Sequence, residues 1–110
     1  MENKEYIKPV ELIKEYLAEQ GINVSGLFLF GSRARGDNNP DSDYDLMIVV
    51  DKDFQQGEKR KLVSKIYKHL IENDSVLNID LVIKPIEYYN WESQNIGFLS
   101  YSVKKEGILV

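Results

Sequence analysis

Apolar side chains recur every three to four residues in two long stretches of the chain, as expected for helices that bury one face. The first stretch predicts a helix from Pro9 to about Gln20, where Gly21 ends it. The second predicts a helix over residues 56–72. Its periodic apolar positions are Leu62, Val63, Ile66, Tyr67, Leu70 and Ile71. Each helix therefore has an apolar face to pack against the rest of the fold.

Three shorter apolar runs predict strands. Val24–Phe30 is rich in apolar and aromatic residues, and Tyr44–Val50 is apolar on both faces beyond its aspartate. A strand that is apolar on both faces is typical of the centre of a sheet. Residues 76–83 alternate and form the third predicted strand, which Pro85 closes.

Two further helices are predicted in the C-terminal third, one from about Ile86 and one before Gly107. The apolar positions of the second are Ile96, Leu99 and Val103. No repeat, low-complexity tract or linker divides the chain, so we expect residues 1–110 to form one domain. Helices that alternate with strands predict an α/β (α+β) fold, in which a mixed β-sheet is flanked by helices.

Composition and charge narrow the classes of function. The sequence is 43% hydrophobic and 29% charged, which is typical of a globular chain, and its lack of cysteine excludes disulfides and thiolate chemistry. A formal net charge of −4 argues against extended nucleic-acid binding, which needs many basic side chains. The first residues lack the basic start and apolar stretch of a secretory signal, and no apolar run approaches the ~20 residues of a membrane span. We therefore expect a cytoplasmic protein without a membrane partner.

Two aspartates open the second predicted strand, where the sequence reads Asp43-Tyr44-Asp45. Because residues two apart on a strand point to the same face, Asp43 and Asp45 present carboxylates ~7 Å apart. Adjacent carboxylates repel unless a cation neutralises them, and hard oxygen ligands suit Mg²⁺ or Mn²⁺. Asp80, in a neighbouring and otherwise apolar strand, is the expected third ligand. The three aspartates are therefore candidate catalytic and metal-binding residues.

Gly31-Ser32 follows the first predicted strand and is a candidate nucleotide-binding turn. Gly31 allows the close approach of a ligand, and Ser32 stands where a short helix should begin, so its hydroxyl and the nearby amides can hold phosphate. Arg33 and Arg35 can add positive charge there or simply remain solvated. Taken alone, Gly-Ser is usually a turn, Asp-X-Asp is often a surface turn or helix cap, and Asp80 can be a core aspartate. Their joint arrangement favours a functional site.

The spacing of Asp41, Asp43 and Asp45 also resembles the start of a calcium-binding loop, which takes ligands from positions one, three and five. Such a loop needs glycine at the sixth position and glutamate at the twelfth. Leu46 and Lys52 stand there instead. We therefore reject this alternative.

The arrangement resembles a known signature. Gly31-Ser32, ten further residues and Asp43-Tyr44-Asp45 are similar to the Gly-Ser-X10-Asp-X-Asp motif of the DNA polymerase β nucleotidyltransferase superfamily. The string GSRARGDNNPDSDYDLMIVV is especially similar to the minimal nucleotidyltransferase (MNT) domain proteins of prokaryotes. Asn78-Ile79-Asp80-Leu81-Val82 resembles the later strand that carries the family's third aspartate. The resemblance covers most of the chain.

This resemblance implies a polymerase-β-like fold and the transfer of a nucleoside monophosphate from a nucleoside triphosphate to a hydroxyl, with release of pyrophosphate. It implies that Asp43 and Asp45 hold the metal ions and that Asp80 helps to activate the acceptor hydroxyl. It also implies that Gly31 and Ser32 hold the triphosphate.

Minimal members of this family are commonly paired with a helical HEPN-type protein, a toxin that the MNT partner is described as adenylylating. The resemblance therefore implies ATP as donor, Mg²⁺ or Mn²⁺ as cofactor, a HEPN-type partner with a tyrosine acceptor, and an antitoxin role. The aminoglycoside and poly(A) enzymes carry a helical second domain that is not found in this sequence. Two alternatives stay open: a non-catalytic module that inhibits a partner by binding alone, and a transferase for small molecules such as antibiotics.

Aromatic residues crowd the C-terminal third, and we expect most of them in the core, although an exposed subset would suit a partner interface. They are Tyr88, Tyr89, Trp91, Phe98 and Tyr101. His69, the only histidine, is expected to be a surface or packing residue without a catalytic role.

Overall fold

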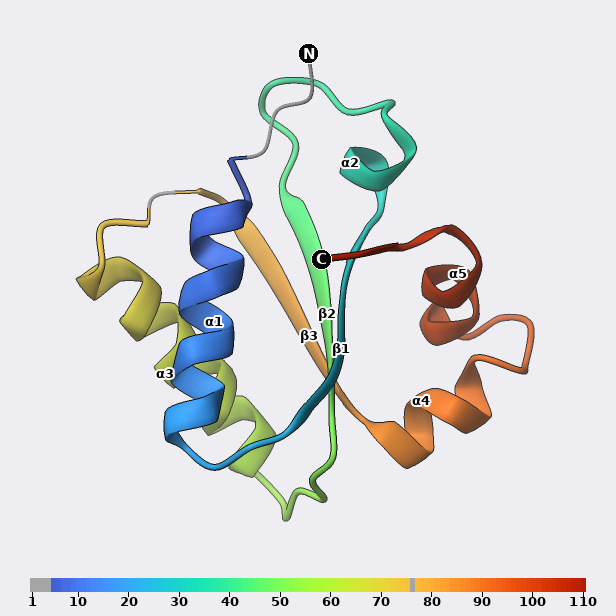
Figure 1. Cartoon of the computed structure of the whole chain (residues 1–110). Coiled ribbons are helices and arrows are strands. Elements are labelled where there is room, and N and C mark those ends of the chain that lie inside the picture. Colours follow the sequence, from blue (N-terminus) through green and yellow to red (C-terminus); the bar gives the residue numbers. More distant parts are fainter. Residues whose placement is uncertain (1–4, 76) are drawn as a thin grey trace.

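The structure, a computed structural model, describes residues 5–75 and 77–110, and within them four strands form one mixed sheet (Figure 1). The strands are β1 (Val24–Phe30), β2 (Tyr44–Val50), β3 (Ile79–Pro85) and β4 (Ile108–Leu109). Their spatial order is β3-β2-β1-β4. Strand β1 runs antiparallel to β2 and β4, whereas β2 and β3 are parallel. The mixed sheet predicted from the sequence is therefore confirmed.

Helices cover both faces of this sheet. The helices of the described residues are α1 (Ile7–Glu19), α2 (Ser32–Arg35), α3 (Glu58–Glu72), α4 (Ile86–Glu92) and α5 (Leu99–Glu106). Helices α1 and α3 lie on one face and α4 and α5 on the other, while the short α2 lies near one end of the sheet (Figure 1). No helix in the described ranges is long and apolar enough to cross a membrane.

The central strand β2 is buried on both faces, as its composition predicted. Leu46, Ile48 and Val50 belong to the larger core, beneath the apolar faces of α1 and α3. Met47 and Val49 belong to a second, smaller core on the side of α4 and α5. Alternate side chains of one strand therefore hold the two helical layers together.

The third strand is displaced from its predicted position at residues 76–83. It begins at Ile79 and continues through Pro85, and residue 76 lies outside the described residues. The parallel register explains both ends, since Tyr44 of β2 pairs with Ile79 and Val50 pairs with Pro85. The partner strand therefore sets the limits of β3, and the proline falls at its last position.

Other element limits also differ from the predicted ones. Helix α1 begins at Ile7, two residues before Pro9, and α3 begins at Glu58. Ile96 precedes α5 and is 83% exposed, so its predicted place on the last helix is wrong. The two-residue β4 was not predicted, because it is too short to show a period and is defined only by pairing with Phe28 and Leu29 of β1.

Three of the aromatic residues expected mostly in the core are exposed. Tyr88 and Trp91 of α4 are 63% and 58% exposed, and Phe98 is 39% exposed. Ile86 and Tyr89 lie three residues apart on the same face of α4, and both pack against the smaller core. Tyr88 and Trp91 lie on its outer side. The exposed subset is the one that would suit an interface.

His69 behaves as a packing residue, as expected from the sequence. It lies on α3, where its ring packs against that of Tyr16 on α1 with 5.1 Å between ring centroids. This contact contributes to the packing of the two helices.

Tyr67 of α3 holds the outer edge of β3 next to Asp80. Its hydroxyl donates a hydrogen bond to the carbonyl oxygen of Ile79 (2.9 Å) and accepts one from the N–H of Leu81 (3.1 Å). These backbone groups flank Asp80 on the side of the strand that no other strand pairs with in the described sheet. One hydroxyl therefore satisfies two edge groups and blocks pairing with another chain.

We expect Tyr67→Phe to destabilise the protein by ~1–3 kcal/mol, because two hydrogen bonds are lost and the edge groups of β3 lose their partner. The free energy of unfolding in urea measures the loss. Tyr101→Phe is the control, since no hydrogen bond of its hydroxyl is found among the described residues. Equal stability of the two variants would show that the hydroxyl of Tyr67 does not hold the edge.

Candidate active site

The parallel pairing of β2 and β3 brings together the aspartates predicted from the sequence. Asp45 and Asp80 are direct partners in the register. Asp43 lies two residues before Asp45, just ahead of the first residue of β2. Asp43 and Asp80 are exposed and Asp45 is half-buried. The carboxylates therefore lie at one end of the sheet, accessible to a ligand.

The electrostatics of Asp45 show that negative charge is concentrated here. Burial raises the pKa of the Asp45 carboxyl above its usual value, and the charges of Asp80 and Asp43 raise it further. Arg35 acts in the opposite direction and lowers it. A cation at this place would relieve the repulsion between the carboxylates.

Gly31 allows the end of β1 to pass directly beside the Asp45 carboxylate. Its φ of 74° and ψ of −155° lie in a region that only glycine adopts readily. A Cβ atom at this position would overlap Oδ2 of Asp45 and lie 3.2 Å from its Cγ. The backbone turns sharply at Gly31 and starts α2 at Ser32. The sharp turn expected at Gly31 is present, and Ser32 directly follows the residue that passes beside Asp45.

The Ser32 side chain has no hydrogen-bond partner within residues 5–75 and 77–110. Its carbonyl oxygen, by contrast, accepts hydrogen bonds from the N–H groups of Gly36 and Asp37 at the end of α2. The backbone is thus fixed while the hydroxyl stays available. The predicted contact of this hydroxyl with phosphate stays a prediction.

Arg33 has a structural position that was not predicted. Its guanidinium lies over the Tyr44 ring, 4.3 Å from the centroid, and donates hydrogen bonds to the carbonyl oxygen of Ser42 (2.9 and 3.2 Å). A further hydrogen bond of 3.3 Å reaches the carbonyl oxygen of Pro40. Arg33 therefore ties α2 to the loop that leads into β2. Its predicted role in binding the nucleotide is additional to these contacts and stays a prediction.

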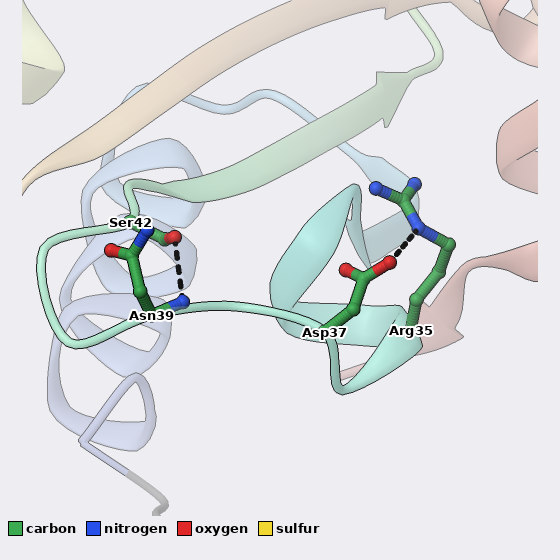
Figure 2. Close-up of polar contacts among 4 residues, drawn as sticks. All are labelled: Arg35, Asp37, Asn39 and Ser42. Atoms are coloured by element: carbon green, nitrogen blue, oxygen red, sulfur yellow. Dashed lines mark hydrogen bonds and ion pairs between the residues drawn. The ribbon is translucent and has the colours of Figure 1, made fainter.

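The loop between α2 and β2 is built from local polar contacts (Figure 2). The Arg35 guanidinium pairs with Asp37 across an Nε–Oδ2 distance of 3.2 Å, and both side chains are exposed. The N–H of Asn39 donates to the Ser42 hydroxyl at 3.1 Å, and the Asn39 side chain accepts from the N–H of Asp41 at 2.9 Å. These local contacts fix the conformation of the loop that directly precedes Asp43. The rejected calcium loop is also absent from the described fold, because Asp45 and the five residues after it form β2.

The donor set fits a divalent cation only in part. In the described ranges, no group of three or more acidic, histidine or cysteine side chains is arranged to hold a metal ion without other ligands. Mg²⁺, however, is commonly held by one or two carboxylates together with substrate phosphates and water. Carboxylates that repel one another beside an open turn suit that kind of incomplete site. The predicted metal site therefore stays a prediction, and it would need phosphate oxygens and water to complete the coordination.

The mixed sheet with helices on both faces, and the aspartates beside a Gly-Ser turn, agree with the nucleotidyltransferase class that the motif resembles. The chain belongs to the family described as Nucleotidyltransferase domain, which residues 10–110 match. It is 32% identical over 83 residues to a putative protein adenylyltransferase of Methanocaldococcus jannaschii, covering 72% of this chain and 78% of that protein. A crystal structure of a putative nucleotidyltransferase from Sulfolobus solfataricus has the same fold, with a TM-score of 0.59 and 22% identity over 96% of this chain and 82% of that one.

Proposed function

We propose that this nucleotidyltransferase moves AMP from ATP to a hydroxyl group of a partner protein in a reaction that requires Mg²⁺ or Mn²⁺. The observation that carries the proposal is the pairing of Asp45 with Asp80 at the exposed end of the sheet, with Gly31 against the Asp45 carboxylate. The similarity to a putative protein adenylyltransferase supports a protein acceptor.

Asp43 and Asp45 would hold the divalent cation together with phosphate oxygens of the nucleotide. The cation, when bound, would neutralise the charge that develops on the phosphates. Asp80 would accept the proton of the acceptor hydroxyl. The hydroxyl oxygen forms a bond to the α-phosphorus, the bond from that phosphorus to the bridging oxygen breaks, and pyrophosphate leaves. Gly31, Ser32 and Arg33 would bind the triphosphate.

We expect Ser32→Ala to lower kcat/KM for ATP by roughly tenfold to a hundredfold. This is the effect of losing one hydrogen bond to a charged group, which is worth ~1.5–3 kcal/mol. The stability of the nucleotide-free protein should change little, because the hydroxyl has no partner in the described residues. Titration with ATP and Mg²⁺ and a transfer assay measure the effect. Ser64→Ala, on the exposed side of α3, is the control. Unchanged kinetics would mean that Gly31-Ser32 is only a turn.

The exposure of Asp43 and Asp80 supports an acceptor brought by a second macromolecule. The net charge of −4 disfavours a long nucleic acid in this role. A tyrosine hydroxyl suits the site because it ionises more readily than an aliphatic alcohol, so Asp80 and the cation need only assist it. The proposed HEPN-type helical partner and antitoxin role are supported only by the resemblance of the motif to the minimal nucleotidyltransferases.

Mass spectrometry of the partner after co-expression tests the proposal. We expect the mass of one adenylate added to a hydroxyl residue, and its loss when Asp43→Asn replaces the wild-type chain. An unmodified partner that the Asp43→Asn variant still inhibits would favour a module that acts by binding alone. Transfer to small hydroxyl compounds without transfer to protein would favour a small-molecule enzyme.

A further inference from the structure

Exposed aromatic side chains line a hollow on the outer side of α4. Tyr88 and Trp91 belong to α4 and Phe98 precedes α5. The rings of Trp91 and Phe98 meet edge to face, with 5.1 Å between centroids and 68° between planes. The hollow has a volume of about 530 Å³. Large aromatic surfaces left in water at one place are typical of a binding site.

The rim of this hollow is acidic. Asp53, Glu87 and Glu92 line it together with the aromatic rings. Glu92 is buried and already paired, because the Lys84 ammonium lies 3.1 and 3.2 Å from its two carboxylate oxygens. Asp53 and Glu87 are exposed, and neither is paired with a cation in the described part of the chain. The hollow thus combines electron-rich ring faces with two carboxylates that form no ion pair in the described residues.

We propose that the hollow binds an arginine side chain presented by a protein partner, a role that rests on the protein acceptor proposed above. A guanidinium group can stack on Trp91 or Tyr88 and at the same time pair with Asp53 or Glu87. Its planar, weakly hydrated cation suits an aromatic surface better than the compact ammonium of lysine. A purely apolar side chain would leave the two carboxylates unused.

The hollow lies at the other end of the sheet from the carboxylates of the active site. Asp45 is near the start of β2, and Asp53 follows the end of this strand at Val50. At ~3.3 Å per residue, the six residues of β2 from Asp45 to Val50 span roughly 17 Å. Helices α2 and α4 lie near opposite ends of the sheet (Figure 1). A partner docked by its arginine would leave the active site open, so docking and chemistry can be separated by mutation.

Trp91 is the only tryptophan of the chain, so its fluorescence and its indole N–H signal report directly on this hollow. The probe is N-acetyl-arginine amide, compared with N-acetyl-citrulline amide, which has a similar shape but no charge. We expect a saturable shift of the indole signal with the arginine probe. The citrulline probe should bind at least about tenfold more weakly, because the cation–π contact and the ion pair are both lost. Equal responses to the two probes, or no response to arginine, would overturn the proposal. Tighter binding of N-acetyl-leucine amide would do so too and would indicate an apolar partner residue.

Charge-removing variants provide the second test. Glu87→Gln and Asp53→Asn should each reduce arginine binding severalfold while leaving citrulline binding unchanged, and Glu11→Gln on α1 should change neither. Wild-type affinity in both rim variants would overturn the proposal. These titrations contain neither nucleotide nor metal. Failure of arginine binding therefore leaves the proposed transfer reaction standing, and failure of transfer does not affect the binding result.

Discussion

Asp45→Asn is expected to lower the rate of AMP transfer by about a thousandfold while the fold is kept. Asparagine has nearly the same shape but no charge, so the cation loses a ligand of the candidate site. Loss of several kcal/mol of charge stabilisation in the transition state corresponds to such a factor, at about 1.4 kcal/mol per tenfold change. Transfer of label from α-labelled ATP to protein measures the rate. Asp51→Asn, just beyond the other end of β2, is the matched control.

The same substitution should stabilise the protein in the absence of metal by ~0.5–1 kcal/mol, because it removes a charge that is disfavoured first by burial and then by the repulsion of Asp80 and Asp43. The raised pKa fixes the sign of the pH dependence, since a carboxyl that is charged less readily in the folded state costs stability once it ionises. The gain should therefore be present at neutral pH and disappear as the pH falls below the range in which the carboxyl ionises. Melting curves with and without Mg²⁺ test this. A fully active Asp45→Asn variant would contradict the metal assignment.

Much of the fold could be predicted from the sequence because its signals are local and periodic. The helical spacing of Leu62, Ile66 and Leu70 predicted α3. The uninterrupted apolar run of β2 predicted that this strand lies in the centre of the sheet. The limits of β3 and the existence of β4 depend on pairing between strands far apart in the chain. Such pairing leaves no period in the sequence, so those features were displaced or missed.

In the candidate site, too, features with a local sequence signal could be predicted, and features that depend on distant contacts could not. The spacing of Asp43 and Asp45, and the position of Asp80 in an otherwise apolar strand, predicted that the three lie close together, and the register of β2 with β3 pairs Asp45 with Asp80. The position of Arg33 could not be predicted, since it depends on the Tyr44 ring and on loop carbonyl groups that only the folded chain brings within reach. The one available signal was an arginine and a tyrosine flanking a short loop, which is too common to be specific.

Gly31→Ala is expected to cost ~2–6 kcal/mol of stability and to abolish transfer. Two effects combine: a backbone conformation reserved for glycine costs ~1–3 kcal/mol, and the new methyl group overlaps the Asp45 carboxylate at a similar cost. Relief of the overlap requires Asp45 to move, and this displaces a candidate metal ligand.

Gly36→Ala separates the two effects, because Gly36 also has a positive φ, 82°, but a Cβ atom there would meet nothing within 4 Å. This variant should lose only the ~1–2 kcal/mol of a left-handed alanine and keep most of its transfer activity. Urea unfolding and the transfer assay, run on both variants, measure the difference. If Gly31→Ala were as stable and as active as Gly36→Ala, the approach of β1 to Asp45 would not matter for the site. If Gly31→Ala were destabilised but fully active, the Gly31 turn would serve the fold alone, and the position of Asp45 would not limit the reaction.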